Sequence, residues 1–194
     1  MSKLETNTID TVSGTSNLTI GSTNTSTITL GASGDTVTVP NGALTGQNYP
    51  AFEASLGADQ TISNATYTTV SASQENLDTD NAYDTSTYKF TPQVAGKYFY
   101  YSQIRFRGTV VNILNNLILR VLKNDTSTVI GNSVMYAGSN DEQFTLNCSG
   151  TVDLNGSTDN IFYQGYASVS SGSPYFESSG TGNTSYFGAY RIGS

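Results

Sequence analysis

The stretch Tyr83-Asp-Thr-Ser-Thr-Tyr-Lys-Phe-Thr-Pro-Gln-Val-Ala-Gly-Lys-Tyr-Phe-Tyr-Tyr101 carries the strongest structural pattern in this chain. Its polar first half predicts a turn, and from Phe90 apolar and polar residues alternate through Pro92, as they do in a β-strand. Gly96 interrupts this alternation, and the aromatic residues 98–101 then predict a second strand. We therefore predict a β-hairpin with a proline at a strand end and a glycine at the corner, two positions that tolerate these residues.

This stretch resembles the signature of the C1q/tumour-necrosis-factor (TNF) superfamily of trimeric jelly rolls. In that signature a Tyr-Asp turn precedes Phe-Thr-Pro and then a strand with glycine, tyrosine and phenylalanine. The matching residues are Tyr83, Asp84, Phe90, Thr91, Pro92, Val94, Gly96, Tyr98 and Phe99. Other segments match in the family's order: residues 52–54 resemble its opening strand, 119–124 a strand ending in Lys-Asn, 152–154 with 159–163 a distal hairpin, and 186–192 the closing strand.

The resemblance implies an all-β fold, a C1q/TNF-like jelly-roll sandwich over about residues 50 to 194, and assembly as a homotrimer. It also gives a role to four consecutive aromatic residues. Side chains alternate along a strand, so Tyr98 and Tyr100 should point to one face and Phe99 and Tyr101 to the other. In the superfamily one such face fills the sandwich and the other lines the threefold axis. We therefore assign these four residues to the core and the trimer axis.

Composition limits the classes of function. The chain has 194 residues, enough for one jelly roll and an appendage, and only 12% of them are charged. The net charge of −7 and the pI near 4.3 argue against nucleic-acid binding, which needs a continuous basic face. No apolar run approaches the ~20 residues of a membrane span, and the polar N-terminus does not resemble a secretory signal. We expect neither membrane insertion nor export by a classical signal.

Residues 1–46 form a separate segment that is rich in Thr, Ser, Asn and Gly. Three short units recur in it, Leu18-Thr-Ile-Gly21, Ile28-Thr-Leu-Gly31 and Val37-Thr-Val-Pro40. Each unit buries too little surface to fold alone, so the repeats predict a β-stalk stabilised by other chains. A disordered linker is the alternative interpretation. We divide the chain into a docking tip and stalk, residues 1–46, and a jelly-roll head, residues 47–194.

The Thr-rich pattern of residues 28–42 resembles the entry segment of structural proteins from tailed bacteriophages of aquatic hosts. This resemblance implies a location in the virion and a non-enzymatic role as a capsid fibre or decoration, attached to other virion proteins through the N-terminus. A tail-fibre tip that binds the host surface is the alternative. A secreted C1q-like ligand is a further alternative, which would require an export signal and a collagen-like or coiled-coil neck.

The sequence offers little to support catalysis. There is no histidine, so a Ser-His-Asp or Cys-His arrangement within one chain is excluded, and so are most zinc sites. Carboxylates cluster at Asp78, Asp80 and Asp84, and again at Asp141 and Glu142, which is typical of polar turns. The first cluster could hold calcium but lacks the glycine and distal glutamate of an EF-hand. We predict no cofactor and assign no metal ligands.

The Gly- and Ser-rich loop of residues 165–185 is the candidate contact loop. Aromatic residues on a background of small polar residues are typical of recognition loops. We predict that Tyr166, Tyr175 and Phe176 face outward at the tip and contact a host-surface glycan or protein. In the alternative interpretation Tyr175 and Phe176 pack beneath the loop as a small core.

The remaining patterns predict further strands at residues 129–136, 142–147, 151–154, 161–169 and 186–192. Within the apolar run of residues 110–122 we place a turn at Asn115-Asn116, followed by a core strand. Cys148 is the one cysteine, and we read it as a small buried side chain. The arginines on neighbouring strands, Arg105, Arg107 and Arg120, are expected to pair with carboxylates across subunits.

Overall fold

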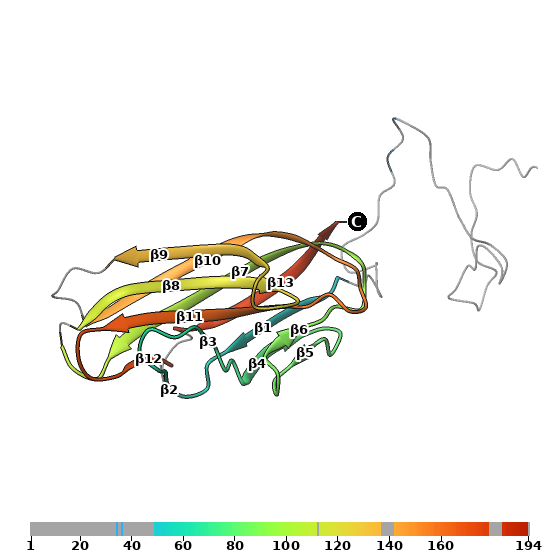
Figure 1. Ribbon diagram of the computed structural model, residues 1–194. Helices are drawn as coiled ribbons and strands as arrows, with labels where there is room; N and C mark the ends of the chain where they lie inside the picture. The colour runs from blue at the N-terminus through green and yellow to red at the C-terminus, as the bar shows by residue number, and fades with distance from the viewer. Residues whose placement is uncertain are drawn as a thin grey trace, which may run out of the picture. The chain divides into compact units, whose positions relative to one another are not determined.

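The computed structural model describes Gly34, Thr36 and residues 49–111, 113–136, 142–178 and 184–193. All regular elements in these ranges are β-strands, and they form two antiparallel sheets that pack face to face (Figure 1). The fold is therefore the predicted all-β sandwich. The three repeat units of the predicted stalk lie outside the described residues, so the stalk stays a prediction.

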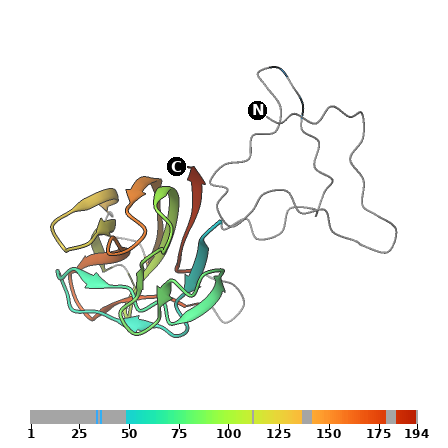
Figure 2. The ribbon, with the colours of Figure 1, turned by 90° about the vertical axis from the view of Figure 1, so that its right-hand side faces the viewer.

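The first sheet is built around the long strand β7 (Gly96–Gly108). One edge of β7 pairs along its length with β10 (Gln143–Leu154), and the other edge pairs with β13 (Tyr186–Gly193) and then with the short β12 (Pro174–Phe176). β1 (Ala51–Ser55) lies beside β13, as Figure 2 shows, and the edge strand β4 (Gln74–Asp78) pairs with β1. β2 (Gln60–Thr61) pairs with β12. We call this the β7 sheet.

The second sheet, which we call the β11 sheet, has the strand order β5, β6, β11, β8 and β9. These strands span Tyr83–Asp84 (β5), Lys89–Phe90 (β6), Ile161–Val169 (β11), Leu114–Lys123 (β8) and Val129–Tyr136 (β9). The short strand β3 (Thr68–Thr69) also pairs with β11. The strands predicted at residues 129–136 and 161–169 are thus confirmed at both ends.

Aromatic side chains fill the space between the two sheets. Phe52 stacks on Phe90 with ring centroids 4.2 Å apart, and Tyr163 stacks on Phe187 at 5.0 Å. Tyr98 and Tyr100 are also fully buried, and their hydroxyls donate to the backbone oxygens of Val94 and Ile130. Burial of these hydroxyl groups raises the pKa of Tyr98 and that of Tyr100 to about 12.

The predicted hairpin between Phe90 and Tyr98 is wrong. Phe90 belongs to β6 in the β11 sheet, whereas Tyr98 belongs to β7 in the other sheet. Their rings meet across the core with centroids 5.8 Å apart. Both positions are aromatic because the two side chains face each other between the sheets, and not because the two strands pair by hydrogen bonds. Pro92 has no N–H to donate to a ladder, and the segment around it crosses from one sheet to the other.

Two other predicted boundaries are also wrong. β8 begins at Leu114 and includes Asn115 and Asn116, so the predicted turn at these two residues is wrong and the chain turns before Leu114. There the backbone N–H of Thr109 donates to the backbone oxygen of Ser173, and the N–H of Ser170 donates to the backbone oxygen of Ile113. The strands predicted at residues 142–147 and 151–154 form the single strand β10. Gly150 lies inside this strand, where a Cβ would come within 2.5 Å of the hydroxyl of Tyr100. Cys148, in the same strand, is partly buried against the core.

Candidate functional site

The outer surface of the β7 sheet carries a group of aromatic side chains. They are Phe99 and Tyr101 on β7 and Tyr186 and Tyr190 on β13, and we call them the aromatic face. Phe99 and Tyr101 are partly exposed, whereas Tyr98 and Tyr100 between them are buried. The predicted alternation along residues 98–101 is therefore confirmed, while the assignment of Phe99 and Tyr101 to a trimer axis stays a prediction.

The rings of the aromatic face touch one another across the two strands. Phe99 lies directly opposite Tyr190, with ring centroids 5.5 Å apart, and Tyr101 lies 6.1 Å from Tyr186. Tyr190 is 44% exposed, and two aliphatic side chains of the same sheet, Ile192 and Leu77, are about half exposed at 49% and 50%. A cluster of packed aromatic side chains thus faces outward on the β7 sheet, a feature that is unusual on the free surface of a monomer.

Tyr101 is fixed in place by its neighbours on the next two strands. Its ring lies across Gly188, where a Cβ would come within 2.4 Å of the tyrosine Cζ. Its hydroxyl then donates to a carboxylate oxygen of Glu53 on β1 at 2.8 Å. Burial, followed by the hydrogen bond and the negative charge of Glu53, raises the pKa of Tyr101 well above its ordinary value. The Glu53 carboxylate thus accepts from the Tyr101 hydroxyl at one oxygen and from the Asn76 amide at the other.

Charged groups lie beyond the aromatic face, toward the far end of β7. Arg105 Nε and Arg107 Nη1 both contact the carboxylate of Glu177, at 2.8 Å and 2.6 Å. The hydrogen bond from Arg107 to Glu177 raises the pKa of this arginine. The carboxylate that both arginines contact belongs to the same chain, and pairing across subunits stays a prediction.

The predicted contact loop is only partly exposed. The expectation that Phe176 faces outward is wrong: its ring is fully buried, meets Phe106 edge-on at 5.5 Å and fills the space above Gly165. Tyr175, the next residue in β12, is partly exposed, because neighbouring strand residues point to opposite faces. Tyr166 lies on β11, in the other sheet, beside Tyr67. The three predicted residues therefore do not form one surface.

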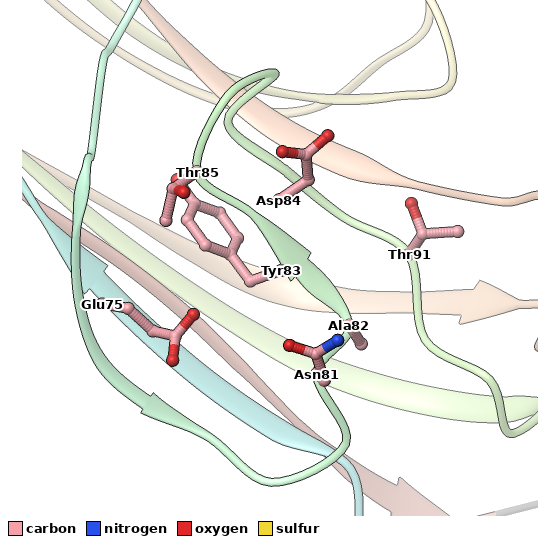
Figure 3. Close-up of a pocket in the computed structure, with 7 residues that line it drawn as sticks. All are labelled: Glu75, Asn81, Ala82, Tyr83, Asp84, Thr85 and Thr91. Atoms are coloured by element: carbon pink, nitrogen blue, oxygen red, sulfur yellow. The ribbon is translucent and has the colours of Figure 1, made fainter.

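A shallow pocket of about 440 Å³ opens between β4 and β5, at one edge of the sandwich. Figure 3 shows Glu75 on one side of it and Asn81, Tyr83 and Asp84 on the other. Asp84 accepts hydrogen bonds from the backbone N–H of Ser86 and from the hydroxyls of Ser86 and Thr87. These bonds lower its pKa to about 2, so Asp84 is charged and committed to its turn at neutral pH.

The other carboxylates of this region also stabilise turns. Asp78 accepts the backbone N–H groups of Asp80 and Tyr83, at 3.1 Å and 2.7 Å. The hydroxyl of Tyr83 donates inward to the backbone oxygen of Ala72. Within the described ranges no three histidine, cysteine or acidic side chains lie close enough to hold a metal ion, and Asp141 lies outside those ranges. The carboxylates Asp78 and Asp84 of this region are therefore engaged in turns.

Comparison with solved structures assigns the architecture. The chain superposes on murine APRIL in crystals at pH 5.0 with a TM-score of 0.54 and 14% identity, over 75% of this chain and all of that one. The fold is a C1q/TNF-like jelly roll. The globular domain of zebrafish complement 1qA matches with a TM-score of 0.49 and 16% identity, over 74% of this chain and 97% of that one. Eiger TNF from S. frugiperda matches with a TM-score of 0.49 and 10% identity, over 75% and 92% of the two chains.

No protein-family model and no curated protein sequence matches this jelly roll. None of its described segments is a helix long and apolar enough to cross a membrane. The structural likeness, at these identities, defines the fold of the head and leaves its partners to be argued from its surfaces.

Sequence reasoning identified one half of the aromatic face and missed the other. Alternation placed Phe99 and Tyr101 on one face of their strand, either the core or the trimer axis, whereas Tyr186, Tyr190 and the supporting Gly188 were given no role. The closing strand contains the signal, because Tyr186, Gly188 and Tyr190 alternate with Phe187 and Ala189. What the sequence alone does not give is the pairing of β13 with β7, which brings the two aromatic rows together.

Proposed function

We propose that this protein is a non-enzymatic jelly-roll head that associates with two further copies of itself through the aromatic face. The aromatic face carries this proposal, because large rings that are packed among themselves and open to water are suited to be the centre of a protein interface. Tyrosine is enriched among the residues that dominate binding energy at interfaces. The threefold arrangement follows the superfamily that the sequence resembles, in which one face of this strand lines the axis.

The electrostatics of the β7 sheet support its burial against another copy. An unpaired charge is costly to bury, whereas a charge that already has a hydrogen-bond partner costs less. Glu53 has its partner in Tyr101, and the two arginines farther along β7 share Glu177. The strand on the other side of β7, β10, places the small polar residues Ser149 and Thr151 opposite Tyr101 and Phe99. A neighbouring subunit would thus meet rings and small side chains, with the ion pair of Lys97 and Asp153 beside them.

A second part of the proposal concerns where the trimer acts. We place the protein in a tailed-phage virion as a capsid fibre or decoration, held by its N-terminal segment. This assignment rests on the pattern of residues 28–42, which lie outside the described residues apart from Gly34 and Thr36. Three copies of one head would raise avidity for a repetitive surface without any new contact.

Sedimentation equilibrium on the full chain tests the self-association. We expect a mass three times the 20.6 kDa of one chain. Replacement Tyr190→Asp should weaken association by about thirtyfold or more, the effect of losing one dominant interface residue. Tyr136→Asp is the matched control, because Tyr136 is 82% exposed on the other sheet. A monomer at all concentrations, or equal effects of the two replacements, would contradict the proposal.

Gold-labelled antibody on purified particles tests the location in the virion. Label over the capsid surface supports the fibre or decoration role. Label confined to the tail supports the alternative, a receptor-binding tip, and absence of label from every particle contradicts the virion assignment while leaving the trimer intact.

A further inference from the structure

The outer surface of the β11 sheet holds a second, different cluster. Tyr67 precedes β3, Arg120 lies on β8, and Gln164 and Tyr166 lie on β11; we call these four residues the Arg120 patch. Gln164 pairs directly with Arg120 across the two strands, and Tyr166 pairs with Ile118 in the next position. The patch therefore lies on the sheet opposite the aromatic face, and its residues are separate from those proposed for self-association.

Arg120 is held in one orientation by neutral groups. Its Nε and Nη2 atoms both donate to the side-chain oxygen of Gln164, at 3.0 Å and 2.6 Å. Gln164 is only 5% exposed, and its amide nitrogen donates to the hydroxyl of Thr69 at 3.1 Å, which fixes the amide. The ring of Tyr67 covers one face of the guanidinium, with Arg120 Cζ 3.6 Å from the ring centroid. The side chain is preorganised, so a ligand would not have to order it.

In the part of the chain that the structure describes, Arg120 has no acidic partner, whereas four other cations of this acidic chain each have one. Lys97 pairs with Asp153, Lys123 with Asp159, and Arg105 and Arg107 with Glu177. No carboxylate of the described residues forms an ion pair with Arg120, and no described group accepts a hydrogen bond from its Nη1 atom. A fixed arginine with free donors and no counter-ion is complementary to a carboxylate, which it can bind through two parallel hydrogen bonds.

The surroundings of Arg120 favour a sugar over a peptide as the carrier of that carboxylate. Tyr67 is 40% exposed, and its ring lies 5.1 Å from that of Tyr166, so two rings offer an apolar platform. Such a platform suits the C–H face of a pyranose. Asn132, directly opposite Arg120 on β9, and Thr69 supply uncharged hydrogen-bonding groups suited to sugar hydroxyls.

We propose that the Arg120 patch is a binding site for acidic saccharides, with the carboxylate of a uronic acid on Arg120 and its ring against Tyr67 and Tyr166. This ligand site is an addition to the proposed self-association, and each copy of the head would carry one such site. It also keeps Tyr166 as a contact residue on a surface other than the loop tip.

Isothermal titration of the full chain with tetragalacturonate, and with the neutral tetrasaccharide maltotetraose, tests this site. We expect tetragalacturonate to bind and maltotetraose to bind at least about tenfold more weakly, because the charged hydrogen bonds are lost. Arg120→Gln should weaken tetragalacturonate binding by about tenfold or more. Arg120→Lys should also weaken it, because lysine keeps the charge but not the planar fork.

Lys89→Gln is the matched control. Lys89 lies over the ring of Phe162 in the same sheet, with Nζ 5.3 Å from the centroid, and its strand partner is Asp84. Its replacement removes the same charge from a residue outside the Arg120 patch and should weaken binding much less than Arg120→Gln, because only a general attraction is lost and not the two parallel hydrogen bonds. Failure of tetragalacturonate to bind, an equal loss in Lys89→Gln and Arg120→Gln, or equal binding of tetraglutamate would each overturn the proposal. The sedimentation mass of the Arg120→Gln variant should equal that of the wild-type protein. An unchanged mass would show that a loss of saccharide binding does not come from a loss of self-association.

Discussion

The outer surfaces of the two sheets differ in how far the charged side chain beside their aromatic rings is hydrogen-bonded by its neighbours. On the aromatic face, rings pack against rings, and the nearby Glu53 is bonded to Tyr101. On the Arg120 patch, rings flank an arginine that is held by a neutral amide and has no acidic partner among the described residues. Both surfaces expose tyrosine, so aromatic content alone does not distinguish them.

This difference indicates two kinds of partner. A surface whose charges are already satisfied loses little when it is covered by another protein surface. A surface that keeps one ordered, unneutralised charge is better suited to a ligand that brings the opposite charge. We therefore assign the aromatic face to self-association and the Arg120 patch to an external ligand, two roles that a single jelly roll can perform at once.

The largest expected effect concerns the core that keeps the two surfaces on opposite sides of one rigid sandwich. Phe176→Ala should lower the free energy of unfolding by about 3–5 kcal/mol, because it empties a fully buried site between the sheets. Tyr175→Ala, at the partly exposed neighbouring position, should cost less than half as much. Urea unfolding at a fixed protein concentration measures both changes. A cost below about 1 kcal/mol for Phe176→Ala would mean that the ring does not join the sheets.

A smaller effect is expected from Gly188→Ala, which acts on the aromatic face alone. The added Cβ would lie 2.4 Å from Tyr101 Cζ and 2.9 Å from the backbone oxygen of Phe52, and overpacking of this kind costs about 1–3 kcal/mol. The replacement should also weaken self-association and leave binding at the Arg120 patch unchanged. In a Tyr101→Ala background the same replacement should cost less. Equal costs in both backgrounds would show that Tyr101 does not lie across Gly188.

The smallest effect concerns acid pH and two turns of the β11 sheet. Asp84 and Asp125 have their pKa values lowered from 3.8 to about 2, chiefly by hydrogen bonds from Ser86 and Ser127 respectively. Because the folded-state pKa is the lower one, this stabilisation is complete above about pH 4 and is lost as the pH falls toward 2. Carboxyl chemical shifts should titrate with midpoints near 2, and Ser86→Ala should raise the midpoint of Asp84 alone. Midpoints near 3.8 in the wild-type protein would contradict these turns.

The sequence predicted the class of fold better than the paths between strands. The strands at residues 161–169 and 129–136 were predicted correctly, because β-branched and aromatic residues recur along each of them. The region from Phe90 to Tyr98 misled us, because alternation of apolar residues reports burial and does not report which sheet a residue joins. The break predicted between residues 147 and 151 is wrong, because Gly150 accommodates a tyrosine of the neighbouring strand and does not end its own strand.

The candidate surfaces depend on contacts between distant parts of the chain, and for this reason they were only half predicted. From their own strand, Phe99 and Tyr101 could be placed on one common face, but alternation did not say whether that face is the inner or the outer one. Tyr190 joins them through a pairing across 91 positions, from 99 to 190, which no local pattern encodes. Arg120 was expected to meet a carboxylate of another subunit, and the neutral Gln164 that holds it is opposite only because β8 pairs with β11 in this register.

The most direct test of the central claim is hydroxyl-radical footprinting of the full chain, read by mass spectrometry at increasing protein concentration. The two tyrosines to compare are Tyr190 on the aromatic face, 44% exposed, and Tyr136 on the other sheet, 82% exposed. We predict that labelling of Tyr190 falls as the protein associates while labelling of Tyr136 stays constant. Constant labelling of Tyr190 in a sample that sediments as a trimer would contradict the claim that the aromatic face is the interface.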